Sequence, residues 1–246
     1  MLHNDLVLFN QNKPGIKRLH AKGILKTSLS KFCLVCYPPR DACKIAEKSE
    51  EIEPNLFDKI NEFGSQKKPI TIYIHIPFCT RLCTFCNFFL KVEKEPNKAI
   101  ANYLEFLKKE IVLTSKKLKE KPIIDSIFFG GGTPSLLQAK QISEIITLLK
   151  ENFSLSKQCE ITLEVHPEIL RMQNDLNHFF KSIRKAGINR ISLGLQSNNE
   201  QILKETKRGH STQEAIEVFK LIKKFGFSSN IDLMYGFKDQ SLESLK

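Results

Sequence analysis

Short β-branched or aromatic runs alternate with stretches of helical periodicity from residue 70 onward, and this alternation restricts the folds open to the chain. The runs predict strands at residues 70–77, 125–129, 160–165, 190–195 and 229–234. Apolar residues between them recur at helical spacing and predict helices through residues 100–111, 142–149, 179–186 and 215–222. Strands that are joined by helices through right-handed crossovers form a parallel α/β sheet.

A parallel barrel and an open doubly wound sheet both satisfy this alternation. The strands are nearly continuously apolar, which predicts a sheet buried on both faces. In either architecture the residues that follow each strand meet at the carboxyl edge of the sheet, where such folds carry their chemistry.

The first 69 residues differ from the rest in their hydrophobic pattern. Their periodicity is weak, Pro38, Pro39 and Pro54 interrupt them, and an acidic helix is expected near residues 43–60. We interpret residues 1–69 as an N-terminal extension and residues 70–246 as the core. The chain stops at the expected start of a fifth helix, so we expect a core that is incomplete at its C-terminal end.

The chain of 246 residues carries a formal net charge of +11. A basic surplus suits nucleic acid or an acidic small molecule, yet the lysines are scattered as singles and pairs, as on a solvated surface. Nucleic-acid binding is therefore the weaker interpretation, and strongly salt-dependent affinity would be its mark. No apolar run approaches the ~18 residues of a membrane span, and residues 1–9 lack a secretory leader, so a cytoplasmic protein is expected.

Cys79, Cys83 and Cys86 follow the first predicted strand at spacings of four and three residues. The odd total of seven cysteines argues against a disulfide framework and favours metal or redox chemistry. Thiolates are the usual ligands of iron–sulfur clusters, and three of them leave the fourth iron of a cubane open to a small molecule. Phe88, two residues past the third cysteine, cannot close that position. A structural zinc site completed by His75, or unrelated buried thiols, are the alternatives.

Glycines and polar residues follow the other strands. Residues 130–133 form a Gly-Gly-Gly-Thr run after the second strand, where bare backbone lets a ligand lie close. Glu164 ends the third strand, Gln196 follows the fourth, and Arg208 and Asp232 come later. Carboxylates, an amide and a guanidinium are thus expected together at the carboxyl edge of the sheet, and they suit a zwitterionic ligand that carries a sugar.

The order of these motifs resembles the radical S-adenosylmethionine (SAM) superfamily, and within it the oxygen-independent coproporphyrinogen III oxidase-like family. The resemblance rests on Cys-x3-Cys-x2-Cys after the Tyr-Ile-His-Ile-Pro-Phe segment of residues 73–78, and it extends to Gln240. It implies a partial parallel (β/α) barrel, truncated near the fifth helix, that binds a [4Fe-4S] cluster through Cys79, Cys83 and Cys86. It also implies one or two SAM molecules and an electron donor of the flavodoxin or ferredoxin type.

By the same resemblance, further residues fall on cofactor-binding positions. Those expected to contact the cluster-bound SAM are Tyr73, Gly131 and Glu164. Those expected to line a second SAM site are Phe85, Gly132, Thr133, Gln196, Arg208 and Asp232. Residues 236–240 depart from the family's Gly-Leu-Pro-Gly-Gln, and this departure weakens the assignment of the second SAM site more than that of the first. No catalytic residue is assigned.

The family implies two kinds of function. In one, SAM is split reductively to a 5′-deoxyadenosyl radical that acts on a porphyrin or heme by oxidation, methylation or ring opening. In the other, a heme chaperone binds heme and transfers it unchanged. Coproporphyrinogen dehydrogenases carry a further cysteine where Phe88 stands, which disfavours that activity here. Residues 84–89 and the long lead before Ile70 are closer to the heme-modifying relatives, but the chaperones share the missing cysteine.

The remaining cysteines carry weaker signals. Cys33 and Cys36 are spaced as in zinc or auxiliary cluster sites and Cys43 lies nearby, but no second pair or nearby histidine completes four ligands. Free thiols are the favoured interpretation of these three. Cys159, at the start of a predicted strand, is expected to be a small buried residue.

Overall fold

The computed structural model describes residues 49–237 and 240, and the structural statements that follow concern these residues. The chain divides into two compact units, Met1–Pro54 and Asn55–Lys246, and the whole sheet lies in the second. The first described element is α2 (Ser49–Ser65), which covers the later part of the expected acidic helix. Cys33, Cys36 and Cys43 lie outside the described residues, and a core boundary at residue 70 stays a prediction.

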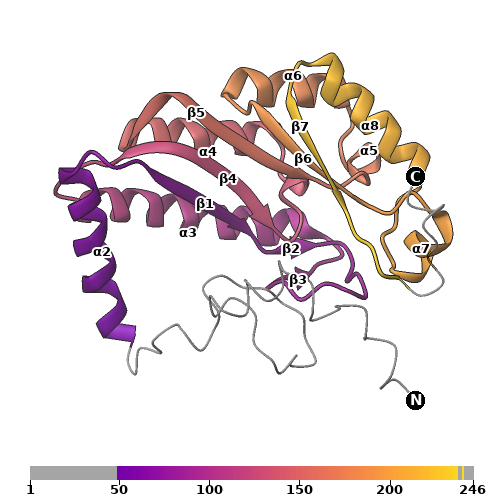
Figure 1. Ribbon diagram of the computed structural model, residues 1–246, viewed down its shortest axis with the longest axis horizontal. Helices are drawn as coiled ribbons and strands as arrows, with labels where there is room; N and C mark the ends of the chain where they lie inside the picture. The colour runs from indigo at the N-terminus through magenta and orange to yellow at the C-terminus, as the bar shows by residue number, and fades with distance from the viewer. Residues whose placement is uncertain (1–48, 238–239, 241–246) are drawn as a thin grey trace, which may run out of the picture. The chain divides into compact units, whose positions relative to one another are not determined.

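The predicted strands and helices of the core all form (Figure 1). The strands are β1 (Ile70–Ile76), β4 (Ile123–Gly131), β5 (Ser154–Val165), β6 (Arg190–Gln196) and β7 (Ser228–Leu233). The helices between them are α3 (Pro96–Lys117), α4 (Ala139–Asn152), α6 (Leu176–Ala186) and α8 (Thr212–Lys224). The elements that sequence analysis missed are β2 (Phe78–Cys79), β3 (Lys91–Val92), η2 (Pro134–Leu136), α5 (Ile169–Met172) and α7 (Glu200–Glu205). Each is too short for a hydrophobic period to show.

The strand order distinguishes the two architectures that the sequence left open. The sheet runs β1-β4-β5-β6-β7, and every neighbouring pair is parallel. A doubly wound sheet reverses its strand order at a switch point, and this sheet does not. When strands lie in the order of the sequence and all their crossovers have the same hand, the connecting helices lie on a single face of the sheet, as in a barrel. The prediction of a parallel (β/α) partial barrel is confirmed.

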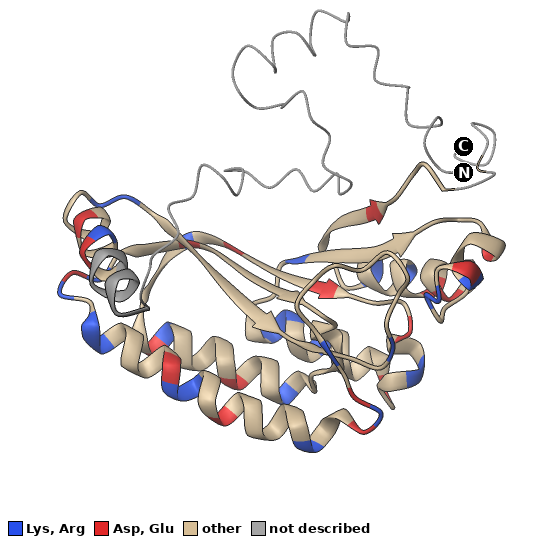
Figure 2. Cartoon of the chain, turned by 90° about the horizontal axis from the view of Figure 1, so that it is seen from below, with Lys and Arg blue, Asp and Glu red and all other residues tan. Residues whose placement is uncertain are grey.

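The helices line one side of the sheet (Figure 2), and the core lies between the two layers. The strands contribute buried residues such as Ile74, Ile127, Leu163 and Leu193. The helices meet them with buried residues from one stripe each, namely Ile100, Leu104, Leu107 and Ile111 on α3, Ile142, Ile145, Ile146 and Leu149 on α4, and Ala215, Val218 and Ile222 on α8. Burial of these stripes drives each helix onto the sheet.

The opposite face of the sheet carries polar or exposed side chains. Thr71 Oγ1 lies 2.7 Å from Ser126 Oγ on the neighbouring strand. Tyr73, on the same face of β1 as Thr71, is 53% exposed. The prediction of a sheet buried on both faces is therefore wrong, because the strands alternate helix-facing apolar residues with residues that face away from the helices.

Charged residues of both signs mingle along the outer helices (Figure 2). Lys108 of α3 and Glu144 of α4 form one such pair, with the Nζ–Oε2 distance at 2.5 Å. This distribution fits the solvated basic surface expected from the sequence. In the described part of the chain, no helix is long and apolar enough to cross a membrane.

Candidate cluster and SAM site

The three cysteines lie on the segment of residues 77–92, which we call the cysteine loop. Its two ends pair through the short parallel strands β2 and β3. The Lys91 N–H donates to Pro77 O (2.6 Å), and the Glu93 N–H donates to Cys79 O (2.8 Å). The loop is thereby closed at its base, directly beyond the carboxyl end of β1.

The thiols have different surroundings. Cys79 is buried, and its Sγ lies 3.3 Å from Thr133 Oγ1. Burial raises the pKa of the Cys79 thiol and the Thr133 hydroxyl lowers it, while Cys86 and Cys83 raise it further. Cys83 is less buried, and its Sγ accepts a hydrogen bond from Arg208 Nη1 (3.5 Å). Cys83 and Cys86 thus both lie close enough to Cys79 to affect its pKa.

The donors expected for the alternative zinc site do not converge on one point among the described residues. Among residues 49–237 and 240, no group of three or more His, Cys, Asp or Glu side chains converges as a site for one metal ion. Zinc needs four ligands at ~2.0–2.3 Å from one point, whereas each thiolate of a cubane binds a different iron. His75, the candidate fourth zinc ligand, is engaged elsewhere. Its Nε2 lies 2.8 Å from Phe89 O, and its Nδ1 lies 3.1 Å from Tyr73 Oη.

The glycine run at the end of β4 lies against the cysteine loop. Gly132 donates its N–H to Ile76 O (2.8 Å), and a Cβ at Gly132 would come within 3.0 Å of Cys79 Sγ and 2.7 Å of Phe78 O. Gly131 has φ +122°, a conformation that side chains disfavour. Bare backbone at these positions therefore lets β4 approach the thiols.

Glu164 projects from the end of β5 toward the same place. Its Oε2 accepts a hydrogen bond from the Gly131 N–H (3.3 Å). Burial raises the pKa of Glu164 to about 7, with the Gly131 N–H lowering it and the nearby Asp232 raising it. A carboxyl group with this pKa changes its charge near neutral pH, so its protonation governs whether it accepts or donates a hydrogen bond.

Arg208 connects the cysteine loop to β6. Its guanidinium donates to Gly194 O through Nη2 and to Cys83 Sγ through Nη1, and it lies 6.0 Å from the centre of the Phe85 ring. The side chain is buried, and its Nε has no hydrogen-bond partner among the described residues. An unsatisfied buried donor beside a cavity is suited to an anionic ligand group such as a carboxylate.

Gln196 and Asp232 lie on β6 and β7. Gln196 has φ +69° where β6 ends and the register with β7 shifts, so the backbone is bent at this point. The carboxylate of Asp232 accepts hydrogen bonds from Ser192 Oγ (3.1 Å) and Asn230 Nδ2 (2.7 Å). Neither partner was predicted from the sequence, because a single polar residue in a strand does not show which group it will contact.

All the predicted site residues except Tyr73 line one cavity of about 380 Å³. This volume lies within the ~300–1,000 Å³ typical of small-molecule sites. Tyr73 lies beside the cavity on β1, with its ring stacked on Phe128 at 6.1 Å between centroids. Thiols for a cluster, a glycine cradle and an unsatisfied guanidinium therefore meet in one place, and these residues fit an iron–sulfur cluster with a zwitterionic ligand.

A larger hollow of about 770 Å³ lies over α4 and α6, and it contains none of the predicted site residues. Long surface side chains such as Lys140 and Lys185 line it. The smaller cavity is the better site because its walls hold converging polar groups.

Comparison with known proteins agrees with this geometry. Residues 73–246 match the family model for the radical SAM superfamily. The heme chaperone HemW of Buchnera aphidicola subsp. Schizaphis graminum is 38% identical over 179 residues, which are 72% of this chain and 45% of HemW. The oxygen-independent coproporphyrinogen III oxidase of Escherichia coli K12 is 33% identical over 202 residues, which are 78% of this chain and 43% of the oxidase.

A solved structure of coproporphyrinogen III oxidase (HemN) from Escherichia coli, a radical SAM enzyme, superposes with a TM-score of 0.70 at 32% identity. The match covers 81% of this chain and 44% of that structure. The chain thus spans less than half the length of the relatives it matches. It belongs to the radical SAM superfamily, in the group that contains HemW and oxygen-independent coproporphyrinogen III oxidase.

Proposed function

We propose that this chain carries the core of a radical SAM enzyme that acts on a porphyrin or heme. Cys79, Cys83 and Cys86 hold a [4Fe-4S] cluster in this proposal, and SAM occupies its open iron. The single observation that carries the proposal is the convergence of the predicted cluster and SAM residues on one cavity of about 380 Å³. When bound, the reduced cluster supplies one electron to the sulfonium of SAM, which yields methionine and a 5′-deoxyadenosyl radical.

The residues around the cavity would hold SAM by complementary polar contacts. Tyr73, Gly131 and Glu164 are proposed contacts of the cluster-bound molecule, in which Glu164 accepts hydrogen bonds from the methionyl amine or the ribose hydroxyls. Phe85, Gly132, Thr133, Gln196, Arg208 and Asp232 are proposed to line a second SAM site. Holding the reactants at a fixed distance and excluding water is the protein's share of the chemistry.

The proposal extends to parts of the protein beyond the cavity. We place residues 70–246 in the core, after an N-terminal extension of residues 1–69. We also propose a cytoplasmic location and an electron donor of the flavodoxin or ferredoxin type. The surplus of basic residues, a formal net charge of +11, would favour encounter with an acidic donor or with the carboxylates of a tetrapyrrole.

The second candidate is a heme chaperone that holds the same cluster and transfers heme without changing it. The similarity to HemW at 38% identity favours it, and the lack of a fourth cysteine, at the position of Phe88, is shared by the chaperones and the heme-modifying relatives. The first candidate requires consumption of SAM with every modified macrocycle. The second requires stoichiometric heme binding with an unmodified macrocycle.

Anaerobic incubation of the reconstituted chain with SAM, dithionite and heme separates the two. A modified macrocycle that forms together with 5′-deoxyadenosine supports the enzyme, and unchanged heme bound one to one supports the chaperone. Electron paramagnetic resonance of the reduced protein, recorded with and without SAM, tests the cofactors that both share. Zinc in place of a cluster, or a spectrum that does not respond to SAM, would contradict the enzyme proposal.

A further inference from the structure

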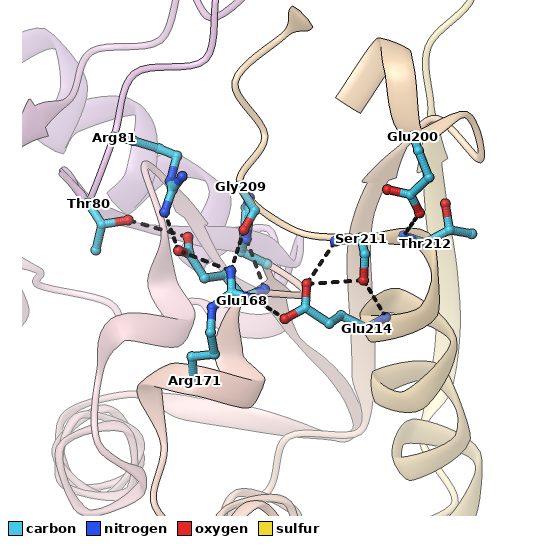
Figure 3. A network of polar contacts seen from close by, with 10 residues as sticks. Thr80, Arg81, Glu168, Arg171, Glu200, Gly209, Ser211, Thr212 and Glu214 are labelled. Atoms are coloured by element: carbon cyan, nitrogen blue, oxygen red, sulfur yellow. Dashed lines mark hydrogen bonds and ion pairs between the residues drawn. The ribbon is translucent and has the colours of Figure 1, made fainter. Parts of the chain in front are cut away.

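Glu168 is a buried carboxylate that the proposed chemistry does not use. It is 7% exposed and lies between β5 and α5. Its Oε1 accepts hydrogen bonds from Arg81 Nη2 and from Arg171 Nη2 (3.4 Å), and its Oε2 accepts one from Thr80 Oγ1 (3.4 Å), as Figure 3 shows. Thr80 and Arg81 belong to the cysteine loop. The carboxylate therefore bridges two guanidinium groups that would otherwise repel each other.

Arg171 extends these contacts to the segment of residues 206–211, which carries Arg208. Its Nη2 donates to Gly209 O, and its Nη1 donates to Glu214 near the start of α8 (Figure 3). Glu214 is itself held, because its Oε2 accepts from the Ser211 N–H (2.7 Å) in the capping box of α8. Gly209, which follows Arg208, is thus linked through Arg171 to helices α5 and α8.

Gly209 shows how closely the cysteine loop meets this segment. Its φ is +74°, and a Cβ at this position would overlap the guanidinium of Arg81. The Thr84 N–H also donates to Thr206 O (3.1 Å). Arg81 therefore lies against bare backbone, and only glycine leaves room for it.

We propose that Glu168 is a positioning residue, which with Arg81 and Arg171 sets the distance between the cysteine loop and residues 206–211 and so places Arg208 at Cys83. The contact from Arg208 Nη1 to Cys83 Sγ is 3.5 Å long, so a small displacement of either segment breaks it. As far as it concerns SAM, the inference rests on the proposed function, in which Arg208 contacts the cofactor. Misplacement by ~1 Å from a change outside the reacting groups is enough to lower function severely.

Two pairs of variants in the full chain test this role. Glu168→Gln keeps the shape of the side chain and removes its charge. Its control, Glu144→Gln, breaks the more exposed pair with Lys108 on the outer helices. Gly209→Ala displaces Arg81, whereas its control Gly226→Ala introduces a side chain at nearly the same φ, +70°, into open space. Backbone strain is thus matched, and only the contact with Arg81 differs.

The first readout needs neither cluster nor SAM. In the cluster-free chain, the rate of Cys83 alkylation by iodoacetamide is measured by peptide mass spectrometry, with buried Cys159 as the reference for global unfolding. Glu168→Gln and Gly209→Ala are expected to lower the Cys83 rate several-fold while the Cys159 rate stays unchanged, because a guanidinium beside a thiol promotes its alkylation and Arg208 then lies farther from Cys83. The controls are expected to leave both rates unchanged. In the cluster-loaded chain, Gly209→Ala should bind SAM about tenfold more weakly than Gly226→Ala. Gly209 does not line the cavity, whereas Glu168 does, so this pair reports positioning without loss of a direct contact.

An unchanged Cys83 rate in both network variants overturns the inference. A rise in the Cys83 rate that Cys159 shares also overturns it, because that pattern reports loss of stability alone. If Glu168→Gln does not fold, the comparison of Gly209→Ala with Gly226→Ala decides between the same outcomes. A wild-type cluster that ignores SAM would count against the proposed function only, since the Cys83 alkylation rate is independent of both.

Discussion

Leu163 and Glu164 are neighbours on β5, and they face opposite sides of the sheet. Leu163 is fully buried against the helices, whereas Glu164 lines the cavity and accepts a hydrogen bond from the Gly131 N–H. The same alternation separates apolar Leu193 from polar Ser192 on β6, where Ser192 donates to Asp232 across the strands. One face of the sheet is covered by packed apolar side chains, and the other carries individual polar side chains from separate strands.

The difference shows that the two faces meet different physical requirements. Packing on the helix-covered face requires apolar residues of suitable volume, and many combinations fulfil it. The cavity face requires particular groups from separate segments to meet within hydrogen-bond distance. We therefore expect substitutions on the first face to change mainly the free energy of unfolding, and substitutions around the cavity to change mainly cofactor binding.

The largest effect is expected for Cys79→Ser, which should abolish cluster assembly. A serine hydroxyl does not replace a thiolate as a ligand of iron–sulfur clusters, because these clusters select soft sulfur donors. Iron and sulfide analysis of the anaerobically reconstituted chain should give values near background. Cys159→Ser is the matched control, since Cys159 is a buried thiol on β5 that lies outside the cavity. Normal cluster content in Cys79→Ser would refute the assignment of this residue as a ligand.

The next largest effect is expected for Leu163→Ala, on stability. Leu163 is fully buried in the core, so the substitution removes packed volume and leaves a cavity. Leu-to-Ala changes at such positions cost about 2–5 kcal/mol of unfolding free energy. Urea denaturation of the cluster-free chain measures the loss, while iron content per folded chain should stay at the wild-type level. A fall in iron content per folded chain together with the loss of stability would contradict separate roles for the two faces.

A smaller effect is expected for Glu164→Gln, on SAM binding. Glutamine keeps the size of the side chain but loses the carboxylate, and hydrogen bonds to a charged group contribute about 1.5–3 kcal/mol, so SAM affinity at pH 8 should fall by at least about tenfold. Cluster content should not change, because Glu164 is not a proposed ligand. If Glu164→Gln binds SAM as strongly as the wild type does, Glu164 is not a contact of SAM.

The pKa of Glu164, raised to about 7, adds a pH signature to the same variant. Wild-type affinity for SAM should rise as pH increases through 7, because the carboxylate forms, and Glu164→Gln should lack this rise. Stability should move in the opposite direction. The unfolded chain ionises Glu164 near its ordinary pKa of 4.5, before the folded chain does, so the free energy of unfolding falls between pH 4.5 and 7. Denaturation at pH 5 and pH 8 measures this difference, which Glu164→Gln should reduce.

The sequence predicted the strands of the core because each has a local signal. β5 and β6 are marked by β-branched and apolar runs, and Gly187 and Gly226 with positive φ mark the ends of α6 and α8. The polar side of β5 was also legible, because polar residues at 160, 162 and 164 alternate with apolar residues at 161, 163 and 165, but we interpreted the strands as apolar on both faces. Helix α5, with four residues, was too short to leave a hydrophobic period.

The candidate site divides in the same manner. The spacing of Cys79, Cys83 and Cys86 is a local pattern, and it was legible without a structure. The contact of Arg208 with Cys83 joins residues 125 positions apart, and the burial of Glu168 between Arg81 and Arg171 depends on three segments at once. No local pattern announces such contacts, so Glu168 was missed.

The amino-acid sequence by itself determined the alternation of strands and helices, the parallel connections and the cysteine loop, since each depends on residues close together in the chain. The tertiary structure decided the strand order and the meeting of Glu164, Arg208 and Asp232 around one cavity. The physical reason is that periodicity reports which side of an element is apolar, whereas the groups that finally touch are set by how the elements pack around the shared core.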